Sequence, residues 1–282
     1  MTKLFQISLV TIFYCISVQL HSQNNVKETS KAPLTIGDII TLPSKILSEN
    51  RILNIYLPEG YKAQETLKYP VLYVLDGTMN EDFLHIVGLT QYFNLQYTMP
   101  KTIVVGIANV DRKRDFTFPT ADKSLKADYP TTGSSAKFIT FLEKEVQPYI
   151  ENNYSVNATK MIIGQSLGGL LATEILLKKT DLFTHYFIIS PSLWWDNESM
   201  LKEAEGYFKA QKDMDLYVYV SVGTEGDVME SEAKKLSEML KRSNKKKLKT
   251  DFKYLADENH ASILHQSLNE GFKLLWPLKT YD

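Results

Sequence analysis

Residues 161–169, with the sequence MIIGQSLGG, constrain the fold more than any other part of this 282-residue chain. An apolar run over residues 161–164 leads into a G-x-S-x-G pattern around Ser166, and a helical pattern follows over residues 170–179. A turn this tight between a strand and a helix requires glycine two positions before and two positions after the serine. The turn lifts the serine hydroxyl above the strand ends, beside the N-terminus of the helix. We therefore predict Ser166 as a nucleophile, with the backbone N–H of Leu167 directed at a developing oxyanion.

Apolar runs and helical patterns alternate along most of the chain. Most of the apolar runs are continuous, which is typical of central strands covered on both faces. The predicted strands are residues 52–57, 71–75, 103–107, 161–164, 186–190, 217–222 and 252–255. Residues 138–150, 229–243 and 264–275 repeat apolar side chains at helical spacing. Residues 36–42 and 44–57 have the pattern of an antiparallel pair at a sheet edge. This order predicts one α/β domain with a mostly parallel central sheet and helices on both faces.

A serine hydroxyl needs a base to act as a nucleophile, and the chain has five histidines. In α/β-hydrolases the order along the chain is serine, acid, histidine, and the histidine follows the last strand. His260 lies in a polar loop after the run 252–255 and before the last helical pattern. The other four precede the serine, lead into a strand or lie within a helical pattern. His260 is therefore the predicted base.

The acid that orients this histidine is expected after the strand at residues 217–222. The loop there reads Gly223-Thr224-Glu225-Gly226-Asp227, so two carboxylates are available. Either of them can orient the His260 imidazole and stabilise its charged form. We favour Asp227, because its extra distance along the loop lets the chain turn back over the strand end. Glu225 remains the alternative.

The second oxyanion donor in this fold comes from the loop after the third strand. Here the run 71–75 ends in Asp76-Gly77-Thr78. A glycine at this bend lets the backbone approach a substrate closely. We find no residue cluster with metal-ligand spacing and no phosphate-binding glycine loop in the sequence. A metal and a cofactor are therefore not expected.

The N-terminal segment is typical of a secretory signal peptide. Lys3 is followed by a mostly apolar stretch, residues 4–20. This stretch is short for a membrane-spanning helix, and polar residues interrupt it. We expect a signal peptide over residues 1–22, a flexible segment over 23–33 and the α/β-hydrolase domain over 34–282. The mature chain would then be periplasmic or secreted, without an integral membrane segment. Cys15, the only cysteine, would leave with the signal peptide, so no disulfide is expected.

The overall charge bears on the expected partners. The formal net charge is -1 at neutral pH, with 32 basic and 33 acidic residues. This balance gives no electrostatic attraction to nucleic acid or to an anionic membrane. The expected partner is a small-molecule ester.

Taken together, these motifs resemble the putative-esterase (esterase D-like) branch of the α/β-hydrolases. Within that branch, the chain is similar to the siderophore trilactone esterases, which hydrolyse enterobactin and salmochelin. The matching segments span about residues 50–275. They are residues 69–77 (YPVLYVLDG), 111–117 (DRKRDFT), 141–150 (FLEKEVQPYI), 164–169 (GQSLGG) and 190–195 (SPSLWW). We therefore expect the chain to be of the shorter, exported type, without the long N-terminal domain of the cytoplasmic enterobactin esterases.

The resemblance implies roles for several residues. Ser166 and His260 would be nucleophile and base, and the backbone amides of Thr78 and Leu167 would form the oxyanion hole. Some siderophore esterases have a weak or absent third member, which leaves the choice between Glu225 and Asp227 open. Basic and aromatic side chains of the matching segments would contact substrate, with internal ion pairs or packing as the alternatives. These residues are Arg112, Arg114, Trp194 and Trp195.

The sequence thus predicts a serine esterase that acts through an acyl-enzyme, on siderophore trilactones or related esters. One alternative is a carbohydrate esterase that removes acetyl or feruloyl groups. The other belongs to a different class: a ligand-binding protein that keeps the fold without catalysis. The intact Ser166 and His260 argue against the binding protein.

Overall fold

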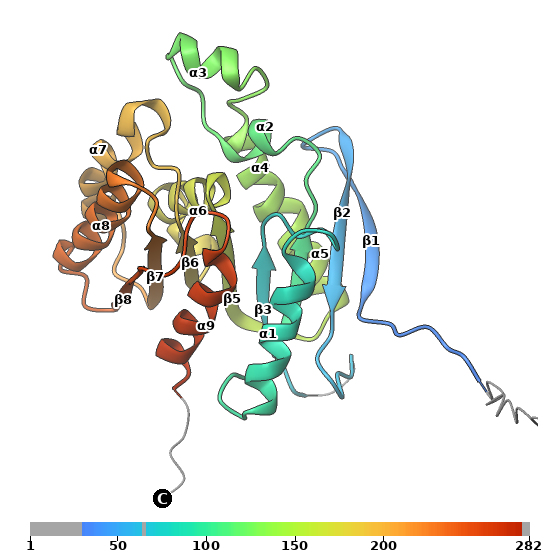
Figure 1. Cartoon of the computed structure of the whole chain (residues 1–282). Helices are drawn as coiled ribbons and strands as arrows, with labels where there is room; N and C mark the ends of the chain where they lie inside the picture. Colours follow the sequence, from blue (N-terminus) through green and yellow to red (C-terminus); the bar gives the residue numbers. More distant parts are fainter. Residues whose placement is uncertain (1–29, 64–65, 278–282) are drawn as a thin grey trace, which may run out of the picture. The chain divides into compact units, whose positions relative to one another are not determined.

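The computed structural model describes residues 30–63 and 66–277 (Figure 1). Its helices and strands all belong to one compact unit, Ile36–Asp282. The predicted signal peptide, residues 1–22, and most of the predicted flexible segment, residues 23–33, lie outside the described residues. None of the described helices is both long enough and apolar enough to span a bilayer.

An eight-stranded sheet forms the centre of the unit, in the order β1-β2-β4-β3-β5-β6-β7-β8. Only the pairs β1–β2 and β2–β4 are antiparallel, and all the other pairs are parallel. The strands are β1 (Asp38–Ser44), β2 (Glu49–Tyr56), β3 (Tyr69–Val74), β4 (Ile103–Ile107), β5 (Val156–Gln165), β6 (His185–Ile189), β7 (Leu216–Gly223) and β8 (Leu248–Leu255). This arrangement confirms the mostly parallel sheet and the antiparallel pair at its edge.

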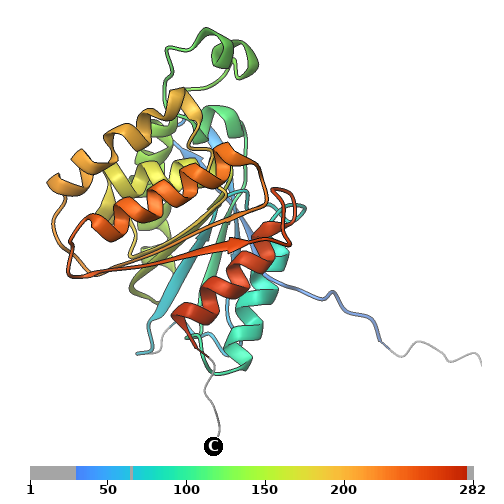
Figure 2. The same ribbon diagram turned by 60° about the vertical axis from the view of Figure 1, so that its left-hand side comes forward.

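Helices cover both faces of the sheet, as predicted. Helices α1 (Phe83–Leu95) and α9 (Ile263–Leu275) lie side by side on one face (Figures 1 and 2). The other face packs against α4 (Ser135–Phe141), α6 (Leu167–Lys178), α7 (Trp195–Ala210) and α8 (Asp227–Arg242). Each face has its own apolar core, because the central strands are buried on both sides. The edge strand β8 is only partly buried.

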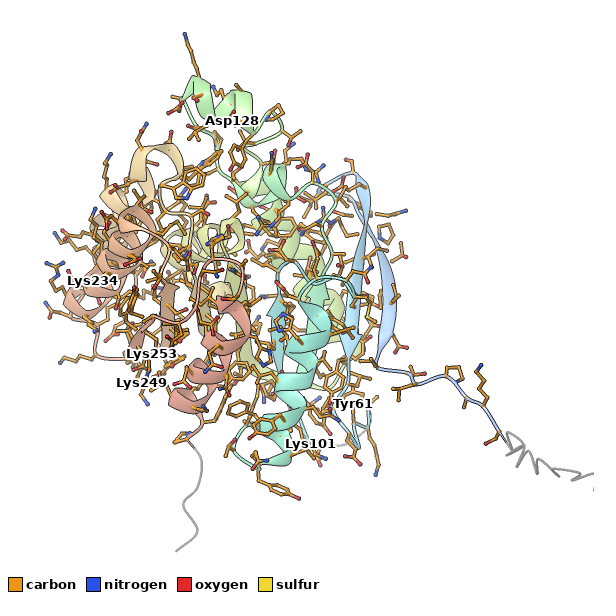
Figure 3. All side chains as sticks on the ribbon, viewed as in Figure 1. Tyr61, Lys101, Asp128, Lys234, Lys249 and Lys253 are labelled. Atoms are coloured by element: carbon orange, nitrogen blue, oxygen red, sulfur yellow. The ribbon has the colours of Figure 1, made fainter. Side chains whose placement is uncertain are left out.

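The helical pattern over residues 138–150 corresponds to three consecutive segments. Helix α4 continues through a π-helical turn, Leu142–Val146, into α5 (Gln147–Asn153). Two short helices, α2 (Arg112–Phe116) and α3 (Lys123–Asp128), precede it, and α3 extends beyond one edge of the sheet in both views. Asp128, at the end of α3, is labelled in Figure 3. Helices α1 and α7 were not predicted. Apolar residues dominate α1, and in α7 a left-handed stretch, Asp196–Glu198, interrupts the helical geometry.

The parallel strands determine where the polar loops gather. In a parallel sheet the carboxyl ends of the strands lie at one edge, and ligands bind outside that edge. The loop at Asp76 follows β3, and Ser166 follows β5. Ser190 comes directly after β6, while the loops of Glu225 and His260 follow β7 and β8. Five successive loops along this edge therefore bring together the residues of the candidate site.

A buried carboxylate lies between α8 and the start of α7. Glu232 on α8 is 1% exposed. Burial and the nearby Glu198 raise the pKa of Glu232 to about 7, while Lys235 and the backbone at Trp194 offset only part of the shift. The folded protein therefore retains this proton up to about pH 7, whereas an unfolded chain loses it near the ordinary glutamate pKa of 4.5. As the pH rises from 4.5 to about 7, the free energy of unfolding therefore falls progressively.

Glu232→Gln should abolish this part of the pH dependence, because glutamine has no proton to lose. The variant and the wild type should be similarly stable at pH 4.5. At pH 8 the variant should be more stable by about 1–3 kcal/mol, since a pKa difference converts directly into unfolding free energy. Urea unfolding at both pH values measures the difference. Glu238→Gln, on the exposed side of the same helix, is the control. If the difference in unfolding free energy between Glu232→Gln and the wild type were the same at pH 4.5 and pH 8, the raised pKa assigned to Glu232 would be wrong.

Candidate active site

Ser166 lies in a tight turn between β5 and α6, as predicted. Its backbone has φ 59° and ψ −121°, a left-handed conformation that is costly for any residue other than glycine. A Cβ added at Gly164 would lie 2.2 Å from the carbonyl oxygen of Gly168, so no side chain fits two positions before the serine. The strand, the turn and the helix together hold the Ser166 hydroxyl at the carboxyl edge of the sheet.

A glycine was also expected to be required two positions after the serine, at Gly168, but the structure shows this requirement at Gly169. A Cβ at Gly168 would meet Asp76 and Leu75 at 3.5–3.6 Å, which is ordinary van der Waals contact. A Cβ at Gly169 would instead lie 2.9 Å from the Cα of Pro191. After the serine, it is therefore the packing of α6 against the loop after β6 that excludes a side chain, and this acts at Gly169.

His260 is held by a carboxylate at the end of the neighbouring strand β7. Its Nδ1 lies 2.6 Å from Oε2 of Glu225, whose side chain is only 2% exposed. Backbone contacts fix the two loops to each other: the N–H of Thr224 donates to the carbonyl of Glu258 at 2.8 Å. The same carbonyl would lie 2.5 Å from a Cβ at Gly223, so a glycine is needed there. The acid loop and the histidine loop thus form one packed unit.

The Glu225 carboxylate accepts two further hydrogen bonds at its other oxygen. The hydroxyl of Ser190 donates to Oε1 at 2.5 Å and the backbone N–H of Gly223 donates at 2.9 Å. Burial raises the pKa of Glu225, but the hydrogen bonds from His260, Ser190 and Gly223 outweigh burial and hold the pKa below its usual value. The carboxylate is therefore charged when it faces the imidazole, as a residue that stabilises an imidazolium must be.

The preference for Asp227 as the partner of His260 is corrected by this geometry. Helix α8 begins at Asp227, directly after the turn at Gly226, which has φ 88°. The chain therefore enters the helix instead of turning back over the strand end. Asp227 lines a cavity between α8 and β8, together with Lys234, which is labelled in Figure 3, and Tyr254. Glu225, which is two residues closer to the strand, is the carboxylate that reaches His260.

Two residues that the sequence did not single out connect the serine to the rest of the site. The side-chain amide of Gln165 donates to the carbonyl of His260 at 2.5 Å, which ties the histidine loop to the residue before the serine. Oγ of Ser192, a buried residue, lies 3.3 Å from Oγ of Ser166. Ser192 and the Glu225 partner Ser190 both belong to the segment SPSLWW, which is one of the segments that carry the family resemblance. That match was the available signal, but it gave neither serine a role.

The predicted oxyanion donors, Leu167 and Thr78, belong to the serine turn and to the bend after β3. Leu167 is the first residue of α6, and the N–H groups of a helix's first turn have no acceptor within the helix. The bend before Thr78 packs against the same turn, because Leu75 and Asp76 lie next to Gly168. Gly77 has a different function from the one expected. A Cβ there would lie 2.4 Å from the Gly106 backbone, so this glycine permits close contact with β4.

Arg112 connects the bend after β3 to the serine turn. Its Nε and Nη2 donate to the two carboxylate oxygens of Asp76 at 2.7 and 2.9 Å, and Nη2 also donates to the carbonyl of Gln165 at 3.2 Å. Burial lowers the pKa of Arg112, but the paired Asp76 outweighs it and raises the pKa. The guanidinium is thus charged, one-third exposed and adjacent to Ser166.

Arg114 and Trp195 serve the interior of the protein. Arg114 pairs with Asp115 at 2.7 Å and with Glu49 at 2.6 Å, which is the internal ion pair considered as the alternative. Trp195 is fully buried, and its indole N–H donates to the carbonyl of Phe118 at 3.0 Å. The expectation that these two residues contact substrate is therefore not supported by their positions.

Trp194 is only partly buried and lies beside Tyr129, with 6.3 Å between the ring centroids. The amino group of Lys113 lies 4.6 Å from the centroid of the Tyr129 ring. Trp194, two residues along the chain from Ser192, therefore forms a partly exposed aromatic surface with Tyr129, and the cation of Lys113 lies nearby. Within residues 30–63 and 66–277, no group of three or more His, Cys, Asp or Glu residues could hold a metal ion.

Comparison with known proteins identifies related esterases. The sequence profile of the family described as "Putative esterase" matches residues 44–265. The ferri-bacillibactin esterase BesA of Bacillus subtilis is 27% identical over 244 residues, which cover 77% of this chain and 82% of BesA. An IroE-like serine hydrolase from Shewanella oneidensis has a TM-score of 0.78 at 30% identity, covering 87% of this chain and 82% of that one. The BES protein from Bacillus cereus has a TM-score of 0.76 at 30% identity, with 89% and 98% covered.

Glu225→Gln and Asp227→Asn should have very different effects on ester hydrolysis. Each change keeps the shape of the side chain and removes its charge. Glu225→Gln should lower kcat by about two to four powers of ten with little effect on KM, because the lost charge acts on the imidazolium in the transition state. Asp227→Asn, the matched control, should leave kcat nearly unchanged. Equal and mild effects on kcat from both variants would indicate a Ser166–His260 pair without an acid.

Ser190→Ala should slow hydrolysis less than the loss of Glu225 does. A hydrogen bond to a charged group contributes about 1.5–3 kcal/mol, so we expect kcat to fall about ten- to a hundredfold as Glu225 loses one of its three donors. Steady-state kinetics of Ser190→Ala and of the exposed control Ser231→Ala give the comparison. The role assigned to Ser190 is wrong if both variants keep the wild-type kcat.

Proposed function

Because the chain belongs to the putative-esterase family and is related to siderophore esterases, we propose that it is a serine hydrolase of carboxylic esters. The observation that supports this most strongly is the 2.6 Å hydrogen bond between Glu225 and His260, in loops that Gln165 ties to the strained turn at Ser166. A nucleophile, a base and an orienting acid on loops along one edge of the sheet are the requirements for acyl transfer.

In the proposed reaction, His260 takes the proton of the Ser166 hydroxyl as its oxygen attacks the ester carbonyl. Glu225 stabilises the resulting imidazolium, and Ser190 with the Gly223 N–H keeps Glu225 charged and in place. Oγ of Ser166 lies 3.3 Å from Oγ of Ser192 in the structure. Contacts between nucleophile and base are often loose without substrate and tighten when it binds. The backbone amides of Leu167 and Thr78 stabilise the oxyanion, and water then hydrolyses the acyl-enzyme.

Esters of siderophores, including cyclic trilactones, are the proposed substrate class. BesA is named for its action on ferri-bacillibactin, and it covers most of this chain. Two features of the site are compatible with such a substrate. The Trp194–Tyr129 surface can contact aromatic acyl groups, and the one-third exposed Arg112 can meet anionic groups. The apolar N-terminal segment further supports a periplasmic or secreted location for this activity.

Ser166→Ala should lower hydrolysis of the best substrate by about a thousandfold or more, with circular dichroism and melting temperature unchanged. His260→Ala should be about as damaging, because the hydroxyl then lacks its base. His185→Ala is the control, since His185 lies at the opposite end of β6 from the site. Near-native rates for Ser166→Ala would rule out the proposed reaction.

The substrate class is tested with a panel of catecholate trilactones, acetylated xylan, feruloylated xylan and short p-nitrophenyl esters. The proposal predicts the highest kcat/KM for a trilactone. Release of acetate or ferulate without trilactone cleavage would instead identify a carbohydrate esterase. Binding of a siderophore without turnover of any ester would identify a non-catalytic binding protein.

A further inference from the structure

Two histidines outside the candidate active site face each other across the α1–α9 contact. His85 is on the first turn of α1 and His265 is on the first turn of α9, 180 residues later. Their Nδ1 atoms are 3.4 Å apart, and the ring centroids are 5.5 Å apart with 49° between the ring planes. Both side chains remain accessible, since His85 is one-third exposed and His265 is exposed.

The distance between the two nitrogens suits a shared metal ion better than a direct hydrogen bond. Hydrogen bonds from N–H groups have donor–acceptor distances of about 2.7–3.2 Å, so 3.4 Å is long for such a bond. Zn²⁺ binds histidine nitrogens at about 2.0–2.1 Å in tetrahedral geometry, which places two such nitrogens about 3.4 Å from each other. The two nitrogens therefore lie at the separation that a shared ion requires.

A carboxylate behind His85 favours the ligand form of its ring. Oδ1 of Asp82 lies 3.2 Å from Nε2 of His85. A carboxylate at this nitrogen holds the proton on Nε2, which leaves the lone pair of Nδ1 available toward His265. A metal-binding histidine characteristically donates its other N–H to such an acceptor, which orients the ring and raises its basicity.

The surroundings leave room for an ion and hold the two rings in place. The histidines line a cavity between α1 and α9, together with Tyr92, Asn269 and Lys273. The amino group of Lys273 is paired with Glu270 at 2.9 Å, which reduces its repulsion of a cation. Farther along the helices, Phe93 and Phe272 pack edge to face at 5.5 Å. The helices are thus held together independently of the histidines.

We propose that His85 and His265 form a binding site for a late first-row divalent metal ion such as Zn²⁺, Ni²⁺ or Cu²⁺. Imidazole is a suitable ligand for all three ions. The described part of the chain offers no third His, Cys, Asp or Glu ligand there, so water completes the coordination. Such a site binds its metal exchangeably. Because α1 follows the Asp76–Thr78 bend and α9 follows the His260 loop, a bound ion links the two helices that flank the candidate active site.

Calorimetric titration of the full-length protein with Zn²⁺ and with Ni²⁺ tests the proposal. All proteins carry Ser166→Ala, so the result does not depend on ester hydrolysis. One equivalent should bind, and the His85→Ala, His265→Ala double substitution should abolish that binding. His185→Ala should have no effect. Asp82→Asn should weaken binding about ten- to a hundredfold, as loss of an orienting carboxylate does.

The melting temperature provides a second readout. A ligand that binds only the folded state stabilises it by an amount that grows with the logarithm of the ligand concentration, so Zn²⁺ should raise the melting temperature of the parent but not of the double variant. The proposal is overturned if the parent and the double variant bind Zn²⁺ and Ni²⁺ equally. It is also overturned if binding persists when either histidine is replaced alone, since one imidazole would then be sufficient.

Discussion

The close approach of two backbone segments around Ser166 sets the geometry of the whole candidate site. Gly164 lies so close to the Gly168 carbonyl that a methyl group would overlap it, and the serine between them is forced into a left-handed conformation. This strain persists because β5 is paired on both sides within the sheet and α6 is buried along its length. The cost of the turn is offset by the core, and the result is a hydroxyl raised above the strand ends.

The neighbouring loops complete the site through contacts that are just as local. Gly223 allows the loop after β7 to touch the loop after β8, and this contact places Glu225 against His260. Gln165 ties the histidine loop back to the serine turn, while Arg112 ties the bend after β3 to it. The nucleophile, the imidazole and the oxyanion bend are thus each fixed to the same short segment, residues 164–169. Preorganisation of this kind lets an active site stabilise charge without rearranging during the reaction.

Much of this arrangement could be predicted from the sequence, because strong local patterns determine it. Continuous apolar runs indicated the buried strands, and the G-x-S-x-G pattern between a strand and a helix indicated the turn at Ser166. The acid could not be chosen in the same way. Glu225 and Asp227 are two residues apart. The choice between them depends on where α8 begins and on how closely the backbones of Gly223 and Glu258 approach each other. Loop packing of this kind leaves no periodic signal. The same limit applies to Ser190 and to the His85–His265 pair, whose partners are distant in the sequence.

The contacts of the candidate site converge on Ser166, which we propose to be a nucleophile activated by His260 and Glu225. Labelling with a fluorophosphonate, followed by intact-mass measurement and peptide mapping, tests this proposal most directly, because this reagent reacts with an activated serine whatever the natural substrate is. We expect one covalent adduct, located on Ser166, whose rate of formation falls sharply in Glu225→Gln but not in Asp227→Asn. An unlabelled protein, or an adduct located on another residue, would contradict the proposal.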